Sequence, residues 1–517
     1  MHNEEMNLAW QFLEGTQISV FLTGKAGTGK TTFLRKLREL SPKRMVILAP
    51  TGVAAINACG QTIHSFFQLP FTPFIPGLRN ENKQRFFRMS KEKKDLIRSL
   101  DLLVIDEISM VRSDLLDAID DTLRRYRNPH KPFGGIQLLL IGDLQQLPPV
   151  VKDNEWTIMS QYYETPYFFS SIALKQLEYV TIELSHIYRQ QDSKFINILA
   201  AIRENRVSRE ILDELNKRCV TEKTDFDDNE WIRLTTHNAT ANSYNELRLA
   251  MLDEVPFTYK AKISGTFPEY SYPTDLSLTL KVGAQVMFVR NDTSTDKRYY
   301  NGRIGRVVSI SNNVITVRCN KETGEGTDTI VVKPEQWENI KFSIDETTKE
   351  ITEEVEGTFT QYPLRLAWAI TVHKSQGLTF SHAVLDINKS FAPGQAYVAL
   401  SRCRTLEGLI LSSPITERTV ITDYDVIHFM ERATADMETH KQSLPILRYQ
   451  FFYSLLSEQF SFSTIANDYD HLMRVAYETF INTKQAYIEI LRANRQQLQA
   501  EVQEVANRFR LQYDTLI

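Results

Sequence analysis

The segment that most constrains this chain is Gly24–Thr31, which reads GKAGTGKT. It fits the pattern GxxxxGK[ST], follows the apolar run Ile18–Thr23 and precedes a helical stretch, Phe33–Leu40. Glycines in such a loop let backbone N–H groups turn toward phosphate oxygens, and the helix that follows adds the positive end of its dipole. The sequence therefore predicts a strand–loop–helix unit that binds the phosphates of a nucleotide.

Individual residues of this loop have predicted roles. Lys30 is expected to reach the β and γ phosphates of ATP, and Thr31 to place its hydroxyl on Mg²⁺. The predicted ATP-binding residues are Gly24, Ala26, Gly27, Thr28, Gly29, Lys30, Thr31 and Thr32. ATP and Mg²⁺ are therefore the expected cofactors.

An acidic pair follows the apolar run Leu102–Ile105. Asp106, at the end of this predicted strand, can hold Mg²⁺ through its water shell. Glu107 can orient and deprotonate the attacking water, as a general base must. Downstream of a phosphate-binding loop, the pair completes a predicted hydrolytic site.

The remaining apolar runs indicate an α/β fold class. They are short and nearly all apolar, as in strands that a parallel sheet buries on both faces. In the first 190 residues they are Ile18–Thr23, Met45–Ala49, Leu102–Ile105 and Leu138–Ile141, and the pattern returns at Trp231–Leu234, Ala383–Ile387 and Leu409–Leu411. The sequence predicts two α/β units.

Two other regions differ in pattern. Residues 276–360 hold short alternating segments, which predict a small inserted β-barrel. These segments are Gln285–Val289, Ile304–Ser309, Val314–Val317 and Thr329–Val332. After residue 425, apolar residues between Ile488 and Phe509 recur at helical spacing, which predicts an amphipathic helix. Packing against the rest of the chain is favoured for this helix over pairing with a partner.

Composition limits the alternatives. A chain of 517 residues is too long for one core, and no apolar run is long enough to span a membrane. The first residues are acidic and polar, so we expect a cytoplasmic protein. The four cysteines lie far apart, which favours reduced thiols over a zinc site or disulfides. The net charge of −4 argues only mildly against a nucleic-acid partner, because a groove needs only local basic charge.

Further segments resemble the motifs of superfamily-one helicases, in the expected order. Thr51–Ala55 with Gly60–Phe66 resembles motif Ia, and Asp106–Met110 resembles motif II. Phe133–Val150, Tyr188–Gln190, Thr371–Thr379 and Gln395–Arg402 resemble motifs III, IV, V and VI. The residues of motifs II and III are similar to those of the Pif-one family of the B-type branch. RecD-like helicases are the nearest alternative. The resemblance covers residues 24–404.

The resemblance implies a domain plan. Two RecA-like motor domains would bind ATP between them and single-stranded DNA across their tops. Residues 1–63 and 99–184 would form the first motor domain, 64–98 a wedge-like insertion, 185–275 and 361–424 the second motor domain, 276–360 the inserted barrel and 425–517 a C-terminal helical domain.

The resemblance also assigns residues to catalysis. Arg189 and Arg402 would be arginine fingers that stabilise the transition state when the cleft closes, with a surface ion pair as the alternative for either. Gln146 would sense the γ-phosphate, with a polar turn residue before Pro148 as the alternative reading. The family's adenine-contacting glutamine has no counterpart, because Met6 stands at its position. Gln11 is the candidate substitute, and the alternative is that the adenine base is recognised only loosely.

DNA contacts are also implied by resemblance. Small hydroxyl groups and backbone amides suit phosphate contacts that carry no base readout. The implied positions are Thr51, His64, Ser65, Phe66, Thr235, Thr236, Asn238, His373, Lys374 and Ser375. Phe66 and Phe67 would stack on bases or lie in the core, and His64 and His373 have the same core alternative.

Residues 78–98 carry a local excess of basic side chains. They hold Arg79, Lys83, Arg85, Arg88, Lys91, Lys93, Lys94 and Arg98 against Glu81, Glu92 and Asp95, with Phe86 and Phe87 among them. Such a patch attracts a phosphate backbone. The proline-containing stretch Phe66–Phe74 before it would present a rigid wedge at a DNA fork, or be an irregular loop before an ordinary helix.

The sequence thus predicts an ATP-dependent DNA helicase with 5′→3′ polarity, a direction that rests on resemblance alone. G-quadruplexes and RNA–DNA hybrids are further candidate substrates. The expected partners are single-stranded DNA and forked or tailed duplexes, with a monomer in solution and dimerisation on DNA left open. Two alternatives remain: a DNA-stimulated ATPase that remodels protein–DNA complexes without unwinding, and the motor subunit of a nuclease complex.

Overall fold

The computed structural model describes most of the chain. It describes residues 3–70, 72–77, 89–190, 192–220, 231–292, 298–311, 314–320, 326–344, 351–387, 392–435, 437–480 and 485–516. These residues form two compact units. The first comprises Met1–Ala9 and Ile18–Met437, and the second comprises Trp10–Gln17 and Glu438–Ile517. Helix α1 (Glu4–Gly15) contributes to both.

The first motor domain is built on a six-stranded sheet in the order β3-β2-β4-β5-β1-β6, and every neighbouring pair is parallel. The strands are β1 (Ser19–Gly24), β2 (Met45–Ala49), β3 (Gln61–Thr62), β4 (Leu102–Ile105), β5 (Gln137–Ile141) and β6 (Tyr179–Leu184). Four of them confirm the predicted strands to within one residue at either end. Their side chains are almost entirely buried, as the continuous apolar runs require.

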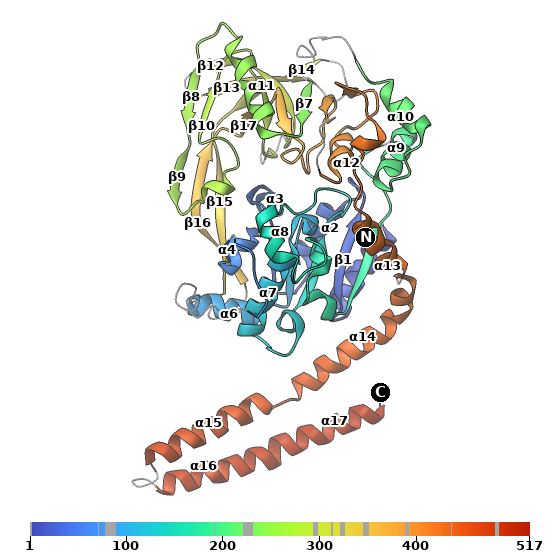
Figure 1. The fold of residues 1–517 in the computed structure, drawn as a ribbon. Coiled ribbons are helices and arrows are strands. Elements are labelled where there is room, and N and C mark those ends of the chain that lie inside the picture. Colours follow the sequence, from blue (N-terminus) through green and yellow to red (C-terminus); the bar gives the residue numbers. More distant parts are fainter. Residues whose placement is uncertain are drawn as a thin grey trace. The chain divides into compact units, whose positions relative to one another are not determined.

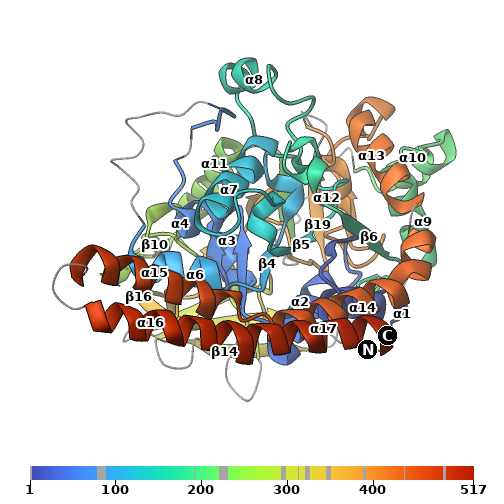
Figure 2. The ribbon, with the colours of Figure 1, turned by 90° about the horizontal axis from the view of Figure 1, so that it is seen from below.

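Helices cover this sheet (Figures 1 and 2). The helices of this domain are α2 (Lys30–Leu40), α3 (Gly52–Asn57), α4 (Ile63–Phe67), α6 (Lys91–Ser99), α7 (Ser113–Tyr126), α8 (Asp153–Met159), which stands out from the sheet in Figure 2, and α13 (Tyr424–Ala435). The 3-10 turns are η1 (Ile108–Met110), η2 (Pro132–Gly135), η3 (Phe168–Ser170) and η4 (Leu174–Gln176). Helix α13 packs against β6, and Val426 joins the core of this domain. The first compact unit therefore extends past residue 425, where we had placed the start of the helical domain.

The second motor domain has a smaller parallel sheet, in the order β18-β7-β19-β20. Its strands are β7 (Ile232–Thr235), β18 (Ala369–Thr371), β19 (Ala383–Asp386) and β20 (Leu409–Leu411). Its helices are α9 (Ser193–Arg203), α10 (Arg209–Asn216), α11 (Asn238–Ala250) and α12 (Gln395–Leu400), with the turn η7 (Glu417–Thr419). Ala26 and Leu147 of the first domain join the core of this second domain, so the two motor domains pack directly on each other.

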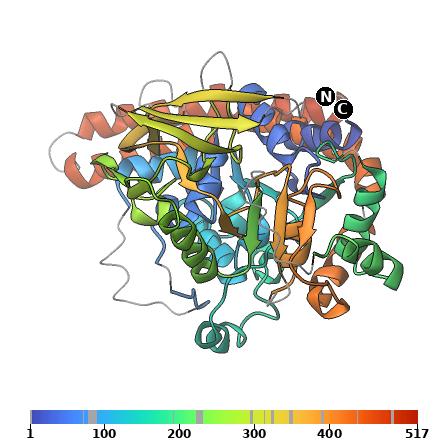
Figure 3. The same ribbon diagram turned by 90° about the horizontal axis from the view of Figure 1, so that it is seen from above.

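Antiparallel strands interrupt the second motor domain (Figure 3, yellow). They form sheets in the orders β14-β13-β12-β11-β17, β15-β16-β9 and β10-β8. Their bounds are β8 (Phe257–Lys260), β9 (Lys262–Gly265), β10 (Ser277–Leu280), β11 (Gln285–Phe288), β12 (Ile304–Ser311), β13 (Val314–Asn320), β14 (Thr327–Val332), β15 (Glu335–Ile344), β16 (Ile351–Gln361) and β17 (Leu364–Leu366), with the turn η6 (Glu269–Ser271).

This insertion is larger than the predicted range of 276–360, and its described strands form separate sheets where we had predicted one barrel. The insertion starts earlier because β8 and β9 pair with β10 and β16. It ends later because β17 pairs with β11. The sequence did not reveal β8 and β9 because their side chains are mostly exposed, so they lack an apolar alternation.

The C-terminal part of the second unit is helical. It contains most of α14 (Met437–Gln459), α15 (Ser463–Phe480), α16 (Gln485–Gln497), the π-helical turn η8 (Leu498–Gln503) and α17 (Glu504–Leu516). Figures 1 and 2 show α15 beside α16, and these helices contact each other. The predicted amphipathic helix between residues 488 and 509 is confirmed as α16, η8 and α17. No helix among the described residues is long and apolar enough to cross a membrane.

Candidate active site

The predicted phosphate loop lies between β1 and α2. Gly24, Gly27 and Gly29 have positive φ values of 148°, 83° and 92°. Residues other than glycine rarely adopt such backbone angles. Lys30 Nζ donates to the carbonyl oxygens of Gly24 at 2.6 Å and Lys25 at 3.1 Å. The ammonium group is thus held inside the loop at the N-terminus of α2, where β and γ phosphates would lie. This arrangement fits ATP.

The acidic pair lies across from this lysine. Glu107 has φ 53°, and its backbone N–H donates to Asp106 Oδ1 at 2.9 Å. Burial, together with the negative charge of Glu107, raises the pKa of Asp106 to about 7. Burial also raises the pKa of Glu107, although Lys30 and Arg402 oppose the shift. Conversely, burial lowers the pKa of Lys30, against the pull of Asp143 and Glu107.

These residues fit a magnesium site. Asp106 offers carboxylate oxygens and Thr31 a hydroxyl, which are the hard oxygen ligands that Mg²⁺ prefers while keeping most of its waters. Two adjacent, half-buried carboxylates also leave negative charge that a divalent cation would neutralise. When bound, the ion would screen the charge of the phosphates and of the pair.

The loop after β5 adds a buried acid that the sequence had not singled out. Asp143 is 1% exposed, and its Oδ2 accepts a hydrogen bond from Gln146 Nε2 at 3.1 Å. Its Oδ1 accepts from the guanidinium of Arg203, at 3.3 Å from Nη2, and from the backbone N–H of Gln145 at 3.2 Å. Gln146, the predicted γ-phosphate sensor, is therefore held by Asp143, which is in turn paired with the second motor domain.

Arg402 is the most buried of the predicted arginine fingers. It is 1% exposed, and its Nε donates to Val398 O at 3.0 Å. Its Nη1 reaches Ser375 O at 3.4 Å and Leu378 O at 3.3 Å. Burial lowers its pKa to about 9, and the nearby positive charge of Arg189 contributes.

Arg189 approaches the phosphate loop itself. A Cβ built on Gly27 would stand 2.4 Å from Cβ of Arg189, so the two segments are in close contact. The backbone N–H of Tyr188 donates to Gly27 O at 2.9 Å. Nη1 of Arg189 is buried and has no hydrogen-bond partner among the described residues. An unpaired buried donor next to a phosphate loop is consistent with an arginine finger.

Further contacts between the two motor domains were not predicted. Gln376 of motif V donates from Nε2 to Glu107 Oε2 at 2.8 Å. Tyr397 of motif VI accepts a hydrogen bond at its hydroxyl from the backbone N–H of Ala26, at 3.1 Å. Both residues lie inside motifs that the sequence located, but only their positions across the cleft reveal what they contact.

The predicted DNA-contacting residues of the first domain lie in different surroundings. Thr51 is exposed and caps α3 by accepting from the N–H of Ala54. Ser65 accepts from Gln61 Nε2 at 3.0 Å, and burial lowers the pKa of His64, which favours a neutral ring. Phe66 is fully buried in the domain core, so its ring is inaccessible to a base in this conformation. Of the two alternatives given for Phe66, the core position fits this burial and base stacking does not.

In the second domain the predicted contacts divide by exposure. Lys374 and Asn238 are exposed, whereas Ser375 is fully buried and its hydroxyl donates to Val372 O. Thr235 and Thr236 are also buried, and His373 is half-buried with a pKa that burial lowers. Lys374 and Asn238 therefore keep the accessibility that a DNA contact needs, and the role of the buried residues stays a prediction.

The adenine contact remains a prediction. Gln11 belongs to the part of α1 that groups with the C-terminal helices. Met6 groups with the motor domains, where its Cε would stand 2.7 Å from a Cβ built on Gly29.

A phosphate loop, an acidic pair and arginines from a second parallel-sheet domain define a nucleotide-hydrolysing motor of two RecA-like domains. A family model described as PIF1-like helicase matches residues 10–212, and one described as DNA helicase, middle domain, matches residues 443–517. Together with a relative that is 35% identical over 80% of this chain, these matches show that the chain belongs to the PIF1-like family of ATP-dependent DNA helicases.

Individual relatives support this membership. The chain is 35% identical to the ATP-dependent DNA helicase Pif1 of Bdellovibrio bacteriovorus, over 80% of this chain and 88% of that protein. It is 35% identical to human ATP-dependent DNA helicase PIF1, over 80% of this chain and 60% of the human protein. The structure of Bacteroides sp Pif1 in complex with ADP-AlF4 is similar, with a TM-score of 0.77, 43% identity and coverage of 84% of this chain and 98% of that one.

The acidic pair generates the first prediction. Glu107→Gln keeps the shape of the side chain and removes the base, so ATP and Mg²⁺ should bind while turnover falls at least about a hundredfold. Asp106→Asn should instead raise the Mg²⁺ concentration needed for half-maximal activity. Steady-state ATPase titrations with Mg²⁺ distinguish the two, and identical behaviour of the two variants would contradict this division of roles.

The arginines generate the second prediction. Arg189→Ala and Arg402→Ala should lower kcat for ATP much more than they raise KM, because their charge matters most in the closed transition state. Arg206→Ala is a matched control, since Arg206 is exposed and pairs with Glu204. A change in KM alone would show that the arginines bind the ground state.

Proposed function

We propose that this chain translocates along single-stranded DNA in the 5′→3′ direction and unwinds duplex DNA ahead of it. The observation that carries the coupling is the hydrogen bond from Gln376 to Glu107. It joins the second motor domain to the carboxylate that would activate water in the first. Hydrolysis would then depend on the relative position of the two domains.

The proposed cycle follows from this dependence. ATP binding brings Arg189 and Arg402 toward the phosphates and closes the cleft, because their positive charge is most favourable next to the triphosphate. Hydrolysis removes that attraction and the cleft reopens. Since the predicted DNA-contacting residues are divided between the two domains, each closure and opening would move one set relative to the other, by one nucleotide per ATP.

Known structures of relatives support the choice of DNA substrate. A structure of Bacteroides Pif1 bound to single-stranded DNA is 42% identical, with a TM-score of 0.61. Another, also 42% identical with a TM-score of 0.60, concerns unwinding at forked duplex DNA by two coordinating Pif1 helicases. We propose the same partners for this chain, with a monomer in solution that dimerises on forked DNA. G-quadruplexes and RNA–DNA hybrids are additional proposed substrates.

Strand displacement provides the third prediction. The purified chain should unwind a duplex with a 5′ single-stranded tail and leave the matched 3′-tailed duplex intact. Lys30→Ala should abolish both hydrolysis and unwinding while single-strand binding persists, because Lys30 is the ammonium group held inside the phosphate loop. Unwinding of the 3′-tailed duplex alone would overturn the proposed direction.

The fourth prediction concerns the wedge proposed for residues 64–98. Arg79, Lys83, Arg85, Phe86, Phe87 and Arg88 lie outside the described residues, and the ordinary helix expected after the proline-containing stretch is described only as α6. The proline-containing stretch is tied down at Phe74, whose N–H donates to Asp114 Oδ2 at 2.8 Å. It also has no helix or strand in its described residues after Phe67.

If this stretch separates strands, replacing residues 68–77 with a short Gly-Ser linker should lower unwinding about tenfold and leave DNA-stimulated ATP hydrolysis unchanged. Asp114→Asn serves as a milder variant, because it weakens the attachment at Phe74 without altering the stretch. Unchanged unwinding by the linker variant would place strand separation elsewhere.

A further inference from the structure

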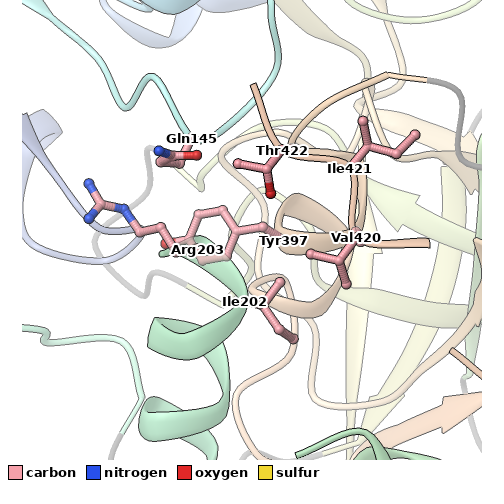
Figure 4. A pocket seen from close by; sticks show the side chains of 9 residues that line it. Gln145, Ile202, Arg203, Tyr397, Val420, Ile421 and Thr422 are labelled. Atoms are coloured by element: carbon pink, nitrogen blue, oxygen red, sulfur yellow. The ribbon is translucent and has the colours of Figure 1, made fainter. Parts of the chain in front are cut away.

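A small cavity of about 10 Å³ lies where three segments of the motor domains meet (Figure 4). Gln145 comes from motif III of the first domain, Arg203 from the end of α9, and Tyr397 from α12. Figure 4 shows the side chains of Arg203 and Tyr397 among those that line the cavity. A space of this size holds about one water molecule, so these segments are nearly in direct contact.

Arg203 connects the second domain to two acids of the first. Its Nη2 lies 3.3 Å from Asp143 Oδ1, and its Nη1 lies 3.1 Å from Glu183 Oε1. The residue is 8% exposed. Burial alone would lower its pKa, but Asp143 and Glu183 outweigh burial and raise it, so the guanidinium stays charged. Because Asp143 also holds Gln146, Arg203 is one contact away from the predicted γ-phosphate sensor.

Tyr397 connects the second motor domain to the phosphate loop of the first. Its hydroxyl accepts the N–H of Ala26 at 3.1 Å, and its ring is 4% exposed. Burial raises the pKa of its hydroxyl to about 12, so the hydroxyl is protonated at neutral pH. Tyr397 lies on α12, the helix that leads into Arg402.

Gly394 shows how closely α12 approaches motif III of the first domain. It precedes α12 with φ 76°, and a Cβ built on it would stand 2.0 Å from Gln146 O and 2.7 Å from Gln145 O. The start of α12 therefore lies directly on the motif III backbone. A contact this close exists only when the two domains are together.

We propose that Arg203 and Tyr397 are positioning residues that hold the closed cleft, Arg203 through Asp143 of motif III and Tyr397 through Ala26 of the phosphate loop. This inference rests on the proposed ATP site. Neither side chain touches the reacting phosphates in this scheme. Both hold α9 and α12 against the first domain. Arg402 is thereby correctly placed relative to Lys30 and Glu107 when the cleft closes.

The consequence is a preference for the transition state. Both contacts cross the cleft, so they stabilise the closed state and are absent from an open one. Losing them should therefore weaken binding of a transition-state analogue, which needs closure, while binding of ADP to the phosphate loop changes little. Replacing a residue that only stabilised the fold would reduce the folded fraction of the protein. The apparent affinities for ADP and for the analogue would then fall together.

The decisive test measures the affinity of the full chain for ADP and for ADP–aluminium fluoride, in Tyr397→Phe. This change deletes one hydroxyl and keeps the ring. One hydrogen bond contributes enough to raise the analogue Kd about three- to tenfold, and the ADP Kd should stay within about twofold. Tyr424→Phe is the matched control, because Tyr424 is 69% exposed.

Arg203→Lys supplies the second arm. Lysine keeps the charge but not the fork that spans Asp143 and Glu183, so the analogue Kd should again rise while the ADP Kd is maintained. Arg206→Lys is its control. Arg203→Gln should give a larger effect, and combining Asp143→Asn with Arg203→Gln should cost less than the sum of the single changes.

An unchanged analogue Kd in Tyr397→Phe would overturn the inference, as would equal losses of ADP and analogue binding with a lowered melting temperature. Failure of the proposed function would look different. In that case the unaltered chain would bind both nucleotides and close on the analogue, but would not unwind a 5′-tailed duplex.

Discussion

The structure of this site depends on charge buried between two domains. Asp106, Glu107 and Asp143 bring carboxylates from the first motor domain. Removing such groups from water costs several kcal/mol each unless opposite charge compensates. The second domain supplies that charge through Arg203 and Arg402. Closing the cleft takes these carboxylates out of water, so the closed arrangement is tolerated only because guanidinium groups of the second domain face them.

The site also requires a close approach of the two motor domains, and glycine allows it at two places. Gly27 lets the phosphate loop meet the backbone around Arg189, and Gly394 lets α12 meet the carbonyls of motif III. Both have positive φ, so a side chain would be strained even without a neighbour. Gly27 belongs to a pattern that the sequence shows. Gly394 does not, since its partner lies far away in the chain.

This difference explains how much could be predicted from the sequence. The sequence predicts Lys30, Asp106 and Glu107 because a phosphate loop and a strand-end acidic pair are local patterns. It predicts most of the parallel strands because burial on both faces requires a continuous apolar run, but β3, β6 and β18 are not among them. Asp143 and Arg203 were missed because a cross-domain pair has no local pattern. A weak signal existed, because Arg203 extends the buried apolar face of α9 that contains Phe195 and Leu199.

The places where the structure differs from the sequence predictions, or decides between them, also have physical causes. Strands β8 and β9 are exposed, so pairing rather than apolar alternation defines them. For Phe66 the sequence leaves base stacking and a core position open, because its motif resembles a DNA-contacting one. In the fold its ring lies in the core against Phe67, with centroids 4.8 Å apart, and Lys93 Nζ covers it at 3.4 Å. An aromatic residue next to a functional motif therefore does not by itself indicate base stacking.

The two predicted arginine fingers are held differently, and this bears on the order of events. Arg402 is bonded to carbonyls at Val398, Ser375 and Leu378, all within the second domain. It is thus oriented by its own domain and arrives with it as a unit. Arg189 has a buried Nη1 without a partner among the described residues, so a phosphate oxygen there would replace an unfavourable state with a charge-assisted hydrogen bond. Binding of the triphosphate would therefore engage Arg189 first, and closure of the whole domain would then bring the already oriented Arg402.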